Sequence, residues 1–289
     1  MNRAYEVEAL PGGKAAHVAM AAHALGARAV WVGFLGGAIG EQVADALHQL
    51  GIEVVPIRTG TGTRVNLEVI EDSDRITEVL DPGHAPSEDE RQEMLRVCGQ
   101  GLRDAWAGAA VVISGSLPAG MPADFYAPLI ESARVAGSKV FLDTSGDALR
   151  ASLRATPDLV KPNRSEAEIL LGRPVGDFTS AVEAARELIA NGVGSAAITL
   201  GAQGMVWLEA RGAPALIARP PRLRVISTVG CGDVTMAGFA FAAQRGLTGE
   251  DALRFAAACG AANVLAKLEG RISAQDVESL IPRIEIERV

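Results

Sequence analysis

The sequence predicts one α/β domain with a mostly parallel sheet and a small β lid. Short apolar strands alternate with helical segments along most of the chain, which is typical of a parallel sheet connected by helices. Three successive strands without helices interrupt this alternation at residues 54–80. Because the chain has no internal repeat or long linker, we expect a core at residues 11–52 and 81–289 and a lid at residues 1–10 and 53–80.

Glycine turns define the first elements. Residues 5–10 alternate apolar and polar side chains, which predicts a short strand. Residues 11–14 read Pro-Gly-Gly-Lys and lead into a helix over residues 15–25 that ends at a glycine. Residues 29–33 are apolar and predict a buried strand, and a second glycine turn leads into a helix closed by Gly51.

The expected lid consists of residues 54–57, 63–70 and 76–80, which have the composition of strands and are separated by short turns. Strands that follow one another directly usually pair antiparallel, so we expect a small antiparallel patch. Such a patch is typical of an insertion or lid and not of the main sheet.

Strand–helix alternation returns after residue 86. Ser87 and Glu90 form a capping-box pattern that opens a helix to about Cys98. Four apolar strands follow, each with a turn and a helical segment after it: residues 111–114, 140–143, 159–161 and 196–200. Residues 205–208 and 215–218 predict a hairpin near the sheet edge. The last expected helices are residues 234–244, residues 251–267 and one opened by Ser273.

The composition is that of an ordinary globular protein without a polyanionic partner. Of the 289 residues, 48% are hydrophobic and 21% charged, and the formal net charge is −8. Because no basic run occurs, we expect neither nucleic acid nor a membrane surface as the main partner. Cys98, Cys231 and Cys259 have no metal-site or disulfide spacing, which indicates a reducing compartment. With no signal peptide and no long apolar run, we expect a cytoplasmic protein.

The clearest sign of chemistry is residues 227–238, which read Ser-Thr-Val-Gly-Cys-Gly-Asp-Val-Thr-Met-Ala-Gly. Gly230 and Gly232 stand directly before Asp233 and an alanine-rich helix. Such a turn exposes backbone N–H groups at the positive end of a helix, where an anion such as phosphate binds. Two roles stay open for Asp233 from this stretch alone: a helix cap, or a base that takes a proton from an attacking hydroxyl.

Polar or glycine-rich turns follow four of the expected strands, at the edge where α/β sheets bind ligands. These turns begin at Ser114, Asp143, Lys161 and Gly201. Asn163 and Glu166 lie three residues apart at the start of a helix. This spacing suits Mg²⁺ binding through water, but it equally suits a helix-capping pair, and both interpretations stay open.

Five motifs carry a resemblance to a known family. They are Pro-Gly-Gly-Lys at residues 11–14, Ser-Gly-Ser-Leu-Pro at 114–118, Lys-Pro-Asn at 161–163, Thr-Leu-Gly-Ala-Gln-Gly at 199–204 and Val-Gly-Cys-Gly-Asp at 229–233. Their order resembles that of the PfkB/ribokinase family of carbohydrate kinases over nearly the whole chain. Residues 142–146 and 161–164 are most similar to the branch of 1-phosphofructokinases and tagatose-6-phosphate kinases. The resemblance implies a ribokinase-like three-layer α/β/α fold, with ATP and Mg²⁺ as co-substrates.

The resemblance also implies roles for single residues. Asp233 is similar to the family's catalytic base, and the amides of Gly230, Cys231 and Gly232 are similar to its anion hole. The resemblance implies that six residues bind the nucleotide: Lys161, Asn163, Thr199, Gly201, Gly204 and Asn263. It also implies that seven residues bind the substrate: Gly12, Gly13, Lys14, His17, Arg64, Ser114 and Asn2. The fork-shaped guanidinium of Arg64, in a lid strand, suits a substrate phosphate. Asn163 and Glu166 are the expected Mg²⁺ ligands, through water.

By this resemblance the chain transfers the γ-phosphoryl group of ATP to a phosphorylated ketohexose. The expected acceptor is of the fructose-1-phosphate, fructose-6-phosphate or tagatose-6-phosphate type, and a homodimer through the β lid is expected from the family.

The chain departs from the family on the acceptor side. The family's first buried strand and a lid strand before Pro11 have no counterpart. Asn2 stands where the family has an aspartate, and His17 where it has an asparagine. A second hypothesis therefore stays open: a non-catalytic or altered-specificity relic that binds nucleotide or sugar phosphate.

Overall fold

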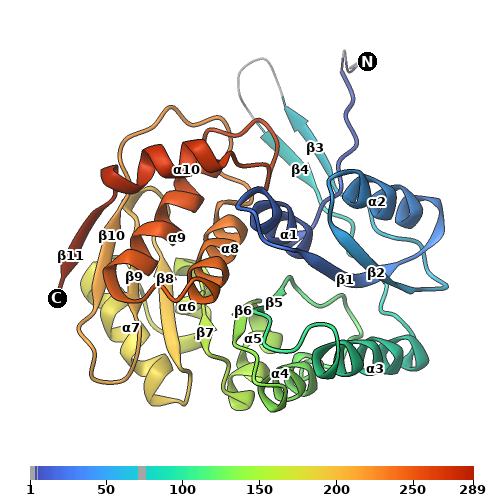
Figure 1. Cartoon of the computed structure of the whole chain (residues 1–289), viewed down its shortest axis with the longest axis horizontal. Coiled ribbons are helices and arrows are strands. Elements are labelled where there is room, and N and C mark those ends of the chain that lie inside the picture. The colour runs from blue at the N-terminus through green and yellow to red at the C-terminus, as the bar shows by residue number, and fades with distance from the viewer. Residues whose placement is uncertain (1–3, 5, 71–75) are drawn as a thin grey trace.

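A seven-stranded sheet forms the centre of the molecule (Figure 1). This computed structural model describes residue 4 and residues 6–70 and 76–289. The strands of the sheet are β5 (Val111–Ser114), β6 (Val140–Asp143), β7 (Leu159–Val160), β8 (Ser195–Thr199), β9 (Met205–Leu208), β10 (Leu216–Arg219) and β11 (Glu285–Arg288). Their order is β11-β10-β9-β8-β7-β6-β5. β5 to β8 pair in parallel, and β9 to β11 continue the sheet with antiparallel pairs.

Helices cover both faces of this sheet, as Figure 1 shows. On one face pack α1 (Lys14–Ala24), α8 (Cys231–Gln244), α9 (Gly249–Asn263) and α10 (Ala274–Leu280). On the other pack α4 (Tyr126–Val135), α5 (Gly146–Ser152), α6 (Arg164–Leu171) and α7 (Phe178–Ala190). Phe141 belongs to the first core, whereas its neighbours Val140 and Leu142 belong to the second, because successive strand side chains point to opposite faces. The three-layer α/β/α prediction is confirmed.

A separate parallel pair lies beside the main sheet. β1 (Val30–Leu35) pairs with β2 (Glu53–Arg58), and α2 (Gly37–Gln49) connects them. The prediction that residues 54–57 belong to an antiparallel lid patch is therefore wrong. A helix between two strands is the usual crossover for parallel pairing, and α2 supplies it. Within the described residues β1 pairs only with β2 and β5 only with β6, and α1 contacts both β1 and β5.

The lid is smaller than the sequence predicts. It is the antiparallel pair of β3 (Leu67–Ile70) and β4 (Ile76–Val79). Residues 63–66 precede β3 without strand structure, and residues 6–10 form no strand. The alternating pattern of residues 6–10 does not produce a strand here because this exposed segment has no ladder partner, and Val7 is 85% exposed. Tyr5, the first residue of that predicted strand, lies outside the described residues.

Two further elements complete the fold. α3 (Glu88–Arg103) begins at Ser87, which forms the predicted capping box with Glu90. β11 was not predicted, because its charged sequence Glu-Ile-Glu-Arg has little strand character of its own. It pairs with β10 and places charged side chains at the sheet edge, which discourages pairing with another chain. Among the helices of the described residues, none combines the length and apolar character needed to cross a bilayer.

A matched pair of isoleucines tests the core. Ile130 of α4 is fully buried, whereas Ile169 of α6 is 68% exposed. We expect Ile130→Ala to lower the free energy of unfolding by about 2–5 kcal/mol, since it removes buried methyl groups and leaves a cavity. Ile169→Ala should change it by less than about 0.5 kcal/mol. Urea unfolding measures the free energy of unfolding of both variants, and its dependence on urea concentration should stay unchanged. Equal losses for the two variants would contradict this core assignment.

Candidate active site

The glycine loop before α8 presents backbone N–H groups at the carboxyl edge of the sheet. Gly230 is the N-cap of α8 and has φ 75°, a left-handed conformation that glycine adopts without strain. Within the described part of the chain, no hydrogen bond leaves the N–H groups of Gly230 and Gly232, while Cys231 N–H contacts Thr228 O at 3.4 Å. Two of the three predicted anion-hole amides are thus free to bind an anion at the positive end of the helix.

The thiol of Cys231 is not a nucleophile candidate. Burial raises its pKa, and the nearby carboxylate of Asp233 adds to the increase. The thiol therefore stays protonated, and the residue can contribute its backbone alone.

Asp233 is buried in the first turn of α8 and does not cap the helix. The N-cap is Gly230, and no side-chain cap hydrogen bond is formed. Instead, Asp233 Oδ2 lies 2.9 Å from Nδ1 of His17, a buried residue of α1. Its other oxygen, Oδ1, has no hydrogen bond to the described residues and can face a ligand at the glycine loop. Of the two roles left open by the sequence, this geometry favours the base.

Two lysines meet a buried carboxylate beside this loop. Lys14 Nζ lies 3.2 Å from Asp143 Oδ1, and Lys161 Nζ lies 3.1 Å from Asp143 Oδ2. A Cβ placed on Gly232 would lie 3.1 Å from Lys161 Nζ, so this ammonium touches the glycine loop. Burial alone would raise the pKa of Asp143, but the two lysines outweigh it and lower this pKa. Asp143 thus stays ionised and fixes both cations at the site.

Asn163 and Glu166 form a reciprocal capping box at the start of α6. Asn163 Oδ1 accepts a hydrogen bond from Glu166 N–H at 2.9 Å, and Glu166 Oε2 accepts one from Asn163 N–H at 2.8 Å. The capping interpretation is confirmed. Glu166 Oε1 takes no part in the cap and lies 4.0 Å from Lys14 Nζ, at the same edge of the sheet. One free carboxylate oxygen fits Mg²⁺ held through water, since this ion keeps most of its hydration shell.

The predicted nucleotide residues differ in position. Thr199 ends β8 and forms a β-bridge with Asn163, so the two strand ends lie together. Gly201 and Gly204 belong to the turn that follows β8. Asn263, however, is 1% exposed. Its Nδ2 donates to Val229 O at 2.7 Å and its Oδ1 accepts from Gly270 N–H at 2.9 Å. Its amide is thus engaged within the protein, and Asn263 braces the glycine loop instead of facing an adenine.

The predicted substrate residues are only partly brought together. Gly12 and Gly13 form the exposed turn that leads into α1. Ser114 ends β5 opposite Asp143, and its buried Oγ has no hydrogen-bond partner in the described chain. Arg64 lies on the exposed segment before β3, beside Gly83, and not in a lid strand as predicted. Asn2 lies outside the described residues.

From the sequence, two residues of this arrangement were given no role, although Asp143 was placed at the start of a polar turn. Asp143 stands at the end of an apolar strand, and a lone carboxylate at that edge of an α/β sheet is a usable signal. Glu269 lies after α9 in an irregular segment, 3.3 Å from Nε2 of His17. Nothing local marks Glu269, since more than 240 positions separate it from the histidine that it meets.

Comparisons with known proteins identify the family of the chain. The family model described as pfkB family carbohydrate kinase matches residues 1–274. The chain is 38% identical over 252 residues to a 1-phosphofructokinase of Rhodobacter capsulatus, covering 86% of this chain and 77% of that protein. It is 32% identical over 274 residues to a 1-phosphofructokinase of Vibrio cholerae serotype O1, and the match covers 95% of this chain and 85% of that protein. A crystal structure of phosphofructokinase-2 from Escherichia coli in complex with potassium superposes with a TM-score of 0.87 at 30% identity. The match covers 94% of this chain and 87% of that chain.

The buried ion pairs predict a pH-dependent effect of Asp143→Asn. Because the folded pKa of Asp143 is lowered, its carboxylate stabilises the fold above its unfolded pKa of about 3.9, and this contribution is lost as the pH falls through the folded pKa. We expect the free energy of unfolding of the variant to be about 3–5 kcal/mol lower than that of the wild type at pH 7, because two lysines are left without their partner. The loss should shrink below about pH 4, where the unfolded chain begins to bind a proton at Asp143, and it should vanish as the pH falls through the lower pKa of the folded state.

Urea unfolding across this pH range measures the difference. The control is Asp124→Asn at an exposed position, which should have little effect. If the difference in the free energy of unfolding between the wild type and Asp143→Asn stays constant down to pH 2, the ion-pair assignment is contradicted.

Proposed function

The chain belongs to the pfkB family of carbohydrate kinases, and from this premise we propose that it transfers the γ-phosphoryl group of ATP to a phosphorylated ketohexose. Family membership makes it a phosphotransferase with an alcohol group as acceptor. The finer proposal rests on Asp233 Oδ1 and the N–H groups of Gly230 and Gly232, which belong to the start of α8 and have no hydrogen bond to the described residues. A base and an anion site at one point are what phosphoryl transfer to a hydroxyl requires.

In the proposed mechanism, Asp233 takes the proton of the acceptor hydroxyl while that oxygen attacks the γ-phosphorus in line. The N–H groups of Gly230 and Gly232 stabilise the charge on the transferring group, each donor contributing a few kcal/mol, roughly as in oxyanion sites. The ammonium of Lys161 beside the loop adds positive charge where the phosphates gather. Asp143 holds this lysine in place through the buried ion pair.

The proposed nucleotide site runs along the carboxyl ends of β7 and β8. Thr199, Gly201 and Gly204 line it, and Asn163 lies next to Thr199. Glu166 Oε1 is the proposed protein oxygen for Mg²⁺, with water between them. When bound there, Mg²⁺ neutralises negative charge on the ATP phosphates.

The proposed acceptor is a fructose phosphate or tagatose phosphate. This proposal rests on the relatives, two of which are named 1-phosphofructokinase, and on the arginine at the root of the lid. Arg64 is exposed there, and its guanidinium suits a phosphate held by two hydrogen bonds. Ser114 Oγ is a further group available for a sugar hydroxyl.

A second candidate function, altered acceptor specificity or binding without turnover, is favoured by the charge of the lid. Glu68 of β3 and Glu78 of β4 are cross-strand partners, and both act electrostatically on Glu269. This face of the lid is therefore acidic, which opposes an anionic acceptor nearby. A panel of phosphorylated and unphosphorylated sugars, assayed for ADP formation, separates the two candidates. Turnover with a ketohexose phosphate supports the first, and turnover with uncharged sugars alone supports the second.

We further propose a homodimer through the other face of the lid. Leu67, Val69 and Val79 share a face of this two-stranded sheet, and each is about half exposed. Exposed apolar side chains on a small, open sheet favour burial against a second copy of the chain.

The role of Asp233 as base predicts the kinetics of Asp233→Asn. The amide keeps the shape of the side chain but cannot accept the hydroxyl proton, so we expect kcat to fall by about 10²–10⁴-fold. ATP binding, measured by calorimetry, should persist because the glycine loop and Lys161 are unchanged. A variant that keeps most of its kcat would sink the assignment.

The dimer proposal predicts that Leu67→Lys dissociates the protein. Burying the new lysine charge in the proposed interface costs roughly several kcal/mol. The variant should therefore be a monomer. Light scattering after size exclusion measures the mass of both forms. The matched control is Val135→Lys on α4, where an 89% exposed valine lies far from the lid in the chain. A wild-type chain that is monomeric at micromolar concentration would contradict the proposal.

A further inference from the structure

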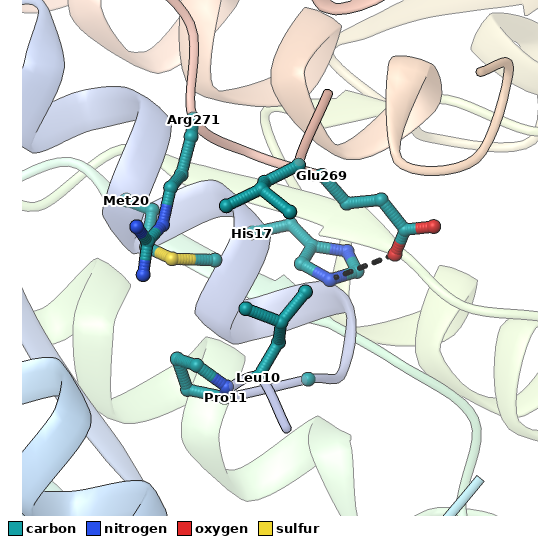
Figure 2. A pocket seen from close by; sticks show the side chains of 8 residues that line it. Leu10, Pro11, His17, Met20, Glu269 and Arg271 are labelled. Atoms are coloured by element: carbon teal, nitrogen blue, oxygen red, sulfur yellow. Dashed lines mark ion pairs between the residues drawn. The ribbon is translucent and has the colours of Figure 1, made fainter. Parts of the chain in front are cut away.

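A small pocket lies on the far side of His17 from Asp233. Its volume is about 50 Å³, and its walls include Leu10, Pro11, Met20, Glu269 and Arg271. Figure 2 shows the imidazole of His17 and the carboxylate of Glu269 pointing toward each other at this pocket, with their ion pair dashed. A volume of this size has room for water molecules, and the polar groups at its wall can hydrogen-bond them.

His17 joins two carboxylates that come from different parts of the chain. Its Nδ1 lies 2.9 Å from Asp233 Oδ2, and its Nε2 lies 3.3 Å from Glu269 Oε2. The side chains of Asp233 and His17 are 7% and 9% exposed, whereas that of Glu269 is 22% exposed. The three groups thus lead from the buried base outward to the pocket.

A relay through these groups needs a proton in each of the two contacts. The contact of His17 Nδ1 with Asp233 Oδ2 is a hydrogen bond, and the contact of Nε2 with Glu269 Oε2 is an ion pair at 3.3 Å. With one proton on Asp233 Oδ2 that points to Nδ1, and one on Nε2 that points to Glu269, the three groups hold two protons and one net negative charge. Oδ1 of Asp233 can then accept a third proton as the one on Oδ2 leaves.

We propose that His17 and Glu269 form a proton relay that carries the proton of the acceptor hydroxyl from Asp233 to water in this pocket. The relay rests on the proposed function of Asp233 as base. The O–H bond of the acceptor breaks as its oxygen bonds to phosphorus, and the proton goes to Asp233. A proton then passes from Asp233 Oδ2 to Nδ1 of His17, another passes from Nε2 to Glu269, and a third leaves Glu269 for water. The unit ends with its original two protons.

The groups around Glu269 favour this direction of transfer. Burial raises the pKa of Glu269, and although His17 opposes this, the carboxylates of Glu68, Asp233 and Glu78 raise the pKa further. Glu269 therefore binds a proton more readily than an exposed carboxylate does, and it can pass that proton to water. Two cations also face this region: Lys14 acts electrostatically on Asp233 from the first turn of α1, and Arg271 lines the pocket.

The backbone holds Glu269 and His17 together. A Cβ on Gly270 would lie 2.7 Å from the Cα of His17, so the segment after α9 packs directly on α1. Gly270 N–H donates to Asn263 Oδ1, and Asn263 also binds Val229 O of the glycine loop. One buried asparagine thus ties the segment that carries Glu269 to the loop that carries the base.

The test compares His17→Asn, Glu269→Gln and the double variant. Asparagine can still hydrogen-bond Asp233, so it keeps a positioning role, but it cannot pass a proton on. We expect each single variant to lower kcat roughly tenfold or more with an unchanged KM for ATP, as for loss of a proton-transfer group. Because the groups act in series, the double variant should be no slower than the slower single variant. Rising concentrations of imidazole buffer should restore kcat in the variants and leave the wild type unchanged.

Matched controls are His23→Asn on the exposed side of α1 and Glu278→Gln on α10, which should keep the wild-type kcat. A wild-type kcat in His17→Asn overturns the relay, as does a loss that buffer does not restore, or effects that multiply in the double variant. The same series is run on ATP hydrolysis with water as acceptor. The proposed function fails separately, if the wild type forms no ADP with any sugar phosphate.

A measurement without turnover tests the chain of contacts itself. In protein with ¹⁵N-labelled histidine, Glu269→Gln should shift the Nε2 resonance of His17 and leave those of His23, His48 and His84 in place. An unshifted His17 resonance would show that Glu269 does not contact the ring, and the relay would be refuted whatever the activity.

Discussion

The buried ion pair of Asp143 with Lys14 and Lys161 is the interaction on which the site depends. The carboxylate ends β6, one lysine begins α1 and the other follows β7, so three separate segments meet at one buried charge. Removing charges from water costs several kcal/mol per ion, roughly, and only close pairing offsets this cost. The three segments must therefore come together in one arrangement, which places Lys161 beside the glycine loop.

In the proposed mechanism, Lys161 and the start of α8 act on the same anion. The helix dipole and the N–H groups of Gly230 and Gly232, which have no hydrogen bond to the described residues, attract an anion, while Lys161 contacts the loop at Gly232. Asp233 opposes an anion by its charge, but His17 takes up one of its oxygens and lies between it and Glu269. The negative charge of the base is thus shared over a chain of groups that leads away from the phosphate site, which lets a carboxylate and an anion site stand side by side.

The lid separates two properties on its two faces. The apolar face of Leu67, Val69 and Val79 is exposed, whereas Glu68 and Glu78 on the opposite face act on Glu269. Because strand side chains alternate, a two-stranded sheet can offer one surface to a second copy and another to the active site. The acidic face acts on Glu269, and it is the observation on which the second candidate function rests.

The sequence by itself determined the α/β class, the strands β5, β6 and β9 to the residue, the capping boxes at Ser87 and Asn163, and the glycine loop. These follow from local patterns: apolar runs, capping pairs and glycines that need no distant partner. Only the tertiary structure decided that residues 54–57 pair with β1, that Asn263 turns inward to brace the loop, and that Glu269 meets His17. Pairing register, burial of a polar side chain and contacts between remote segments depend on which surfaces meet in space, and no local pattern encodes them.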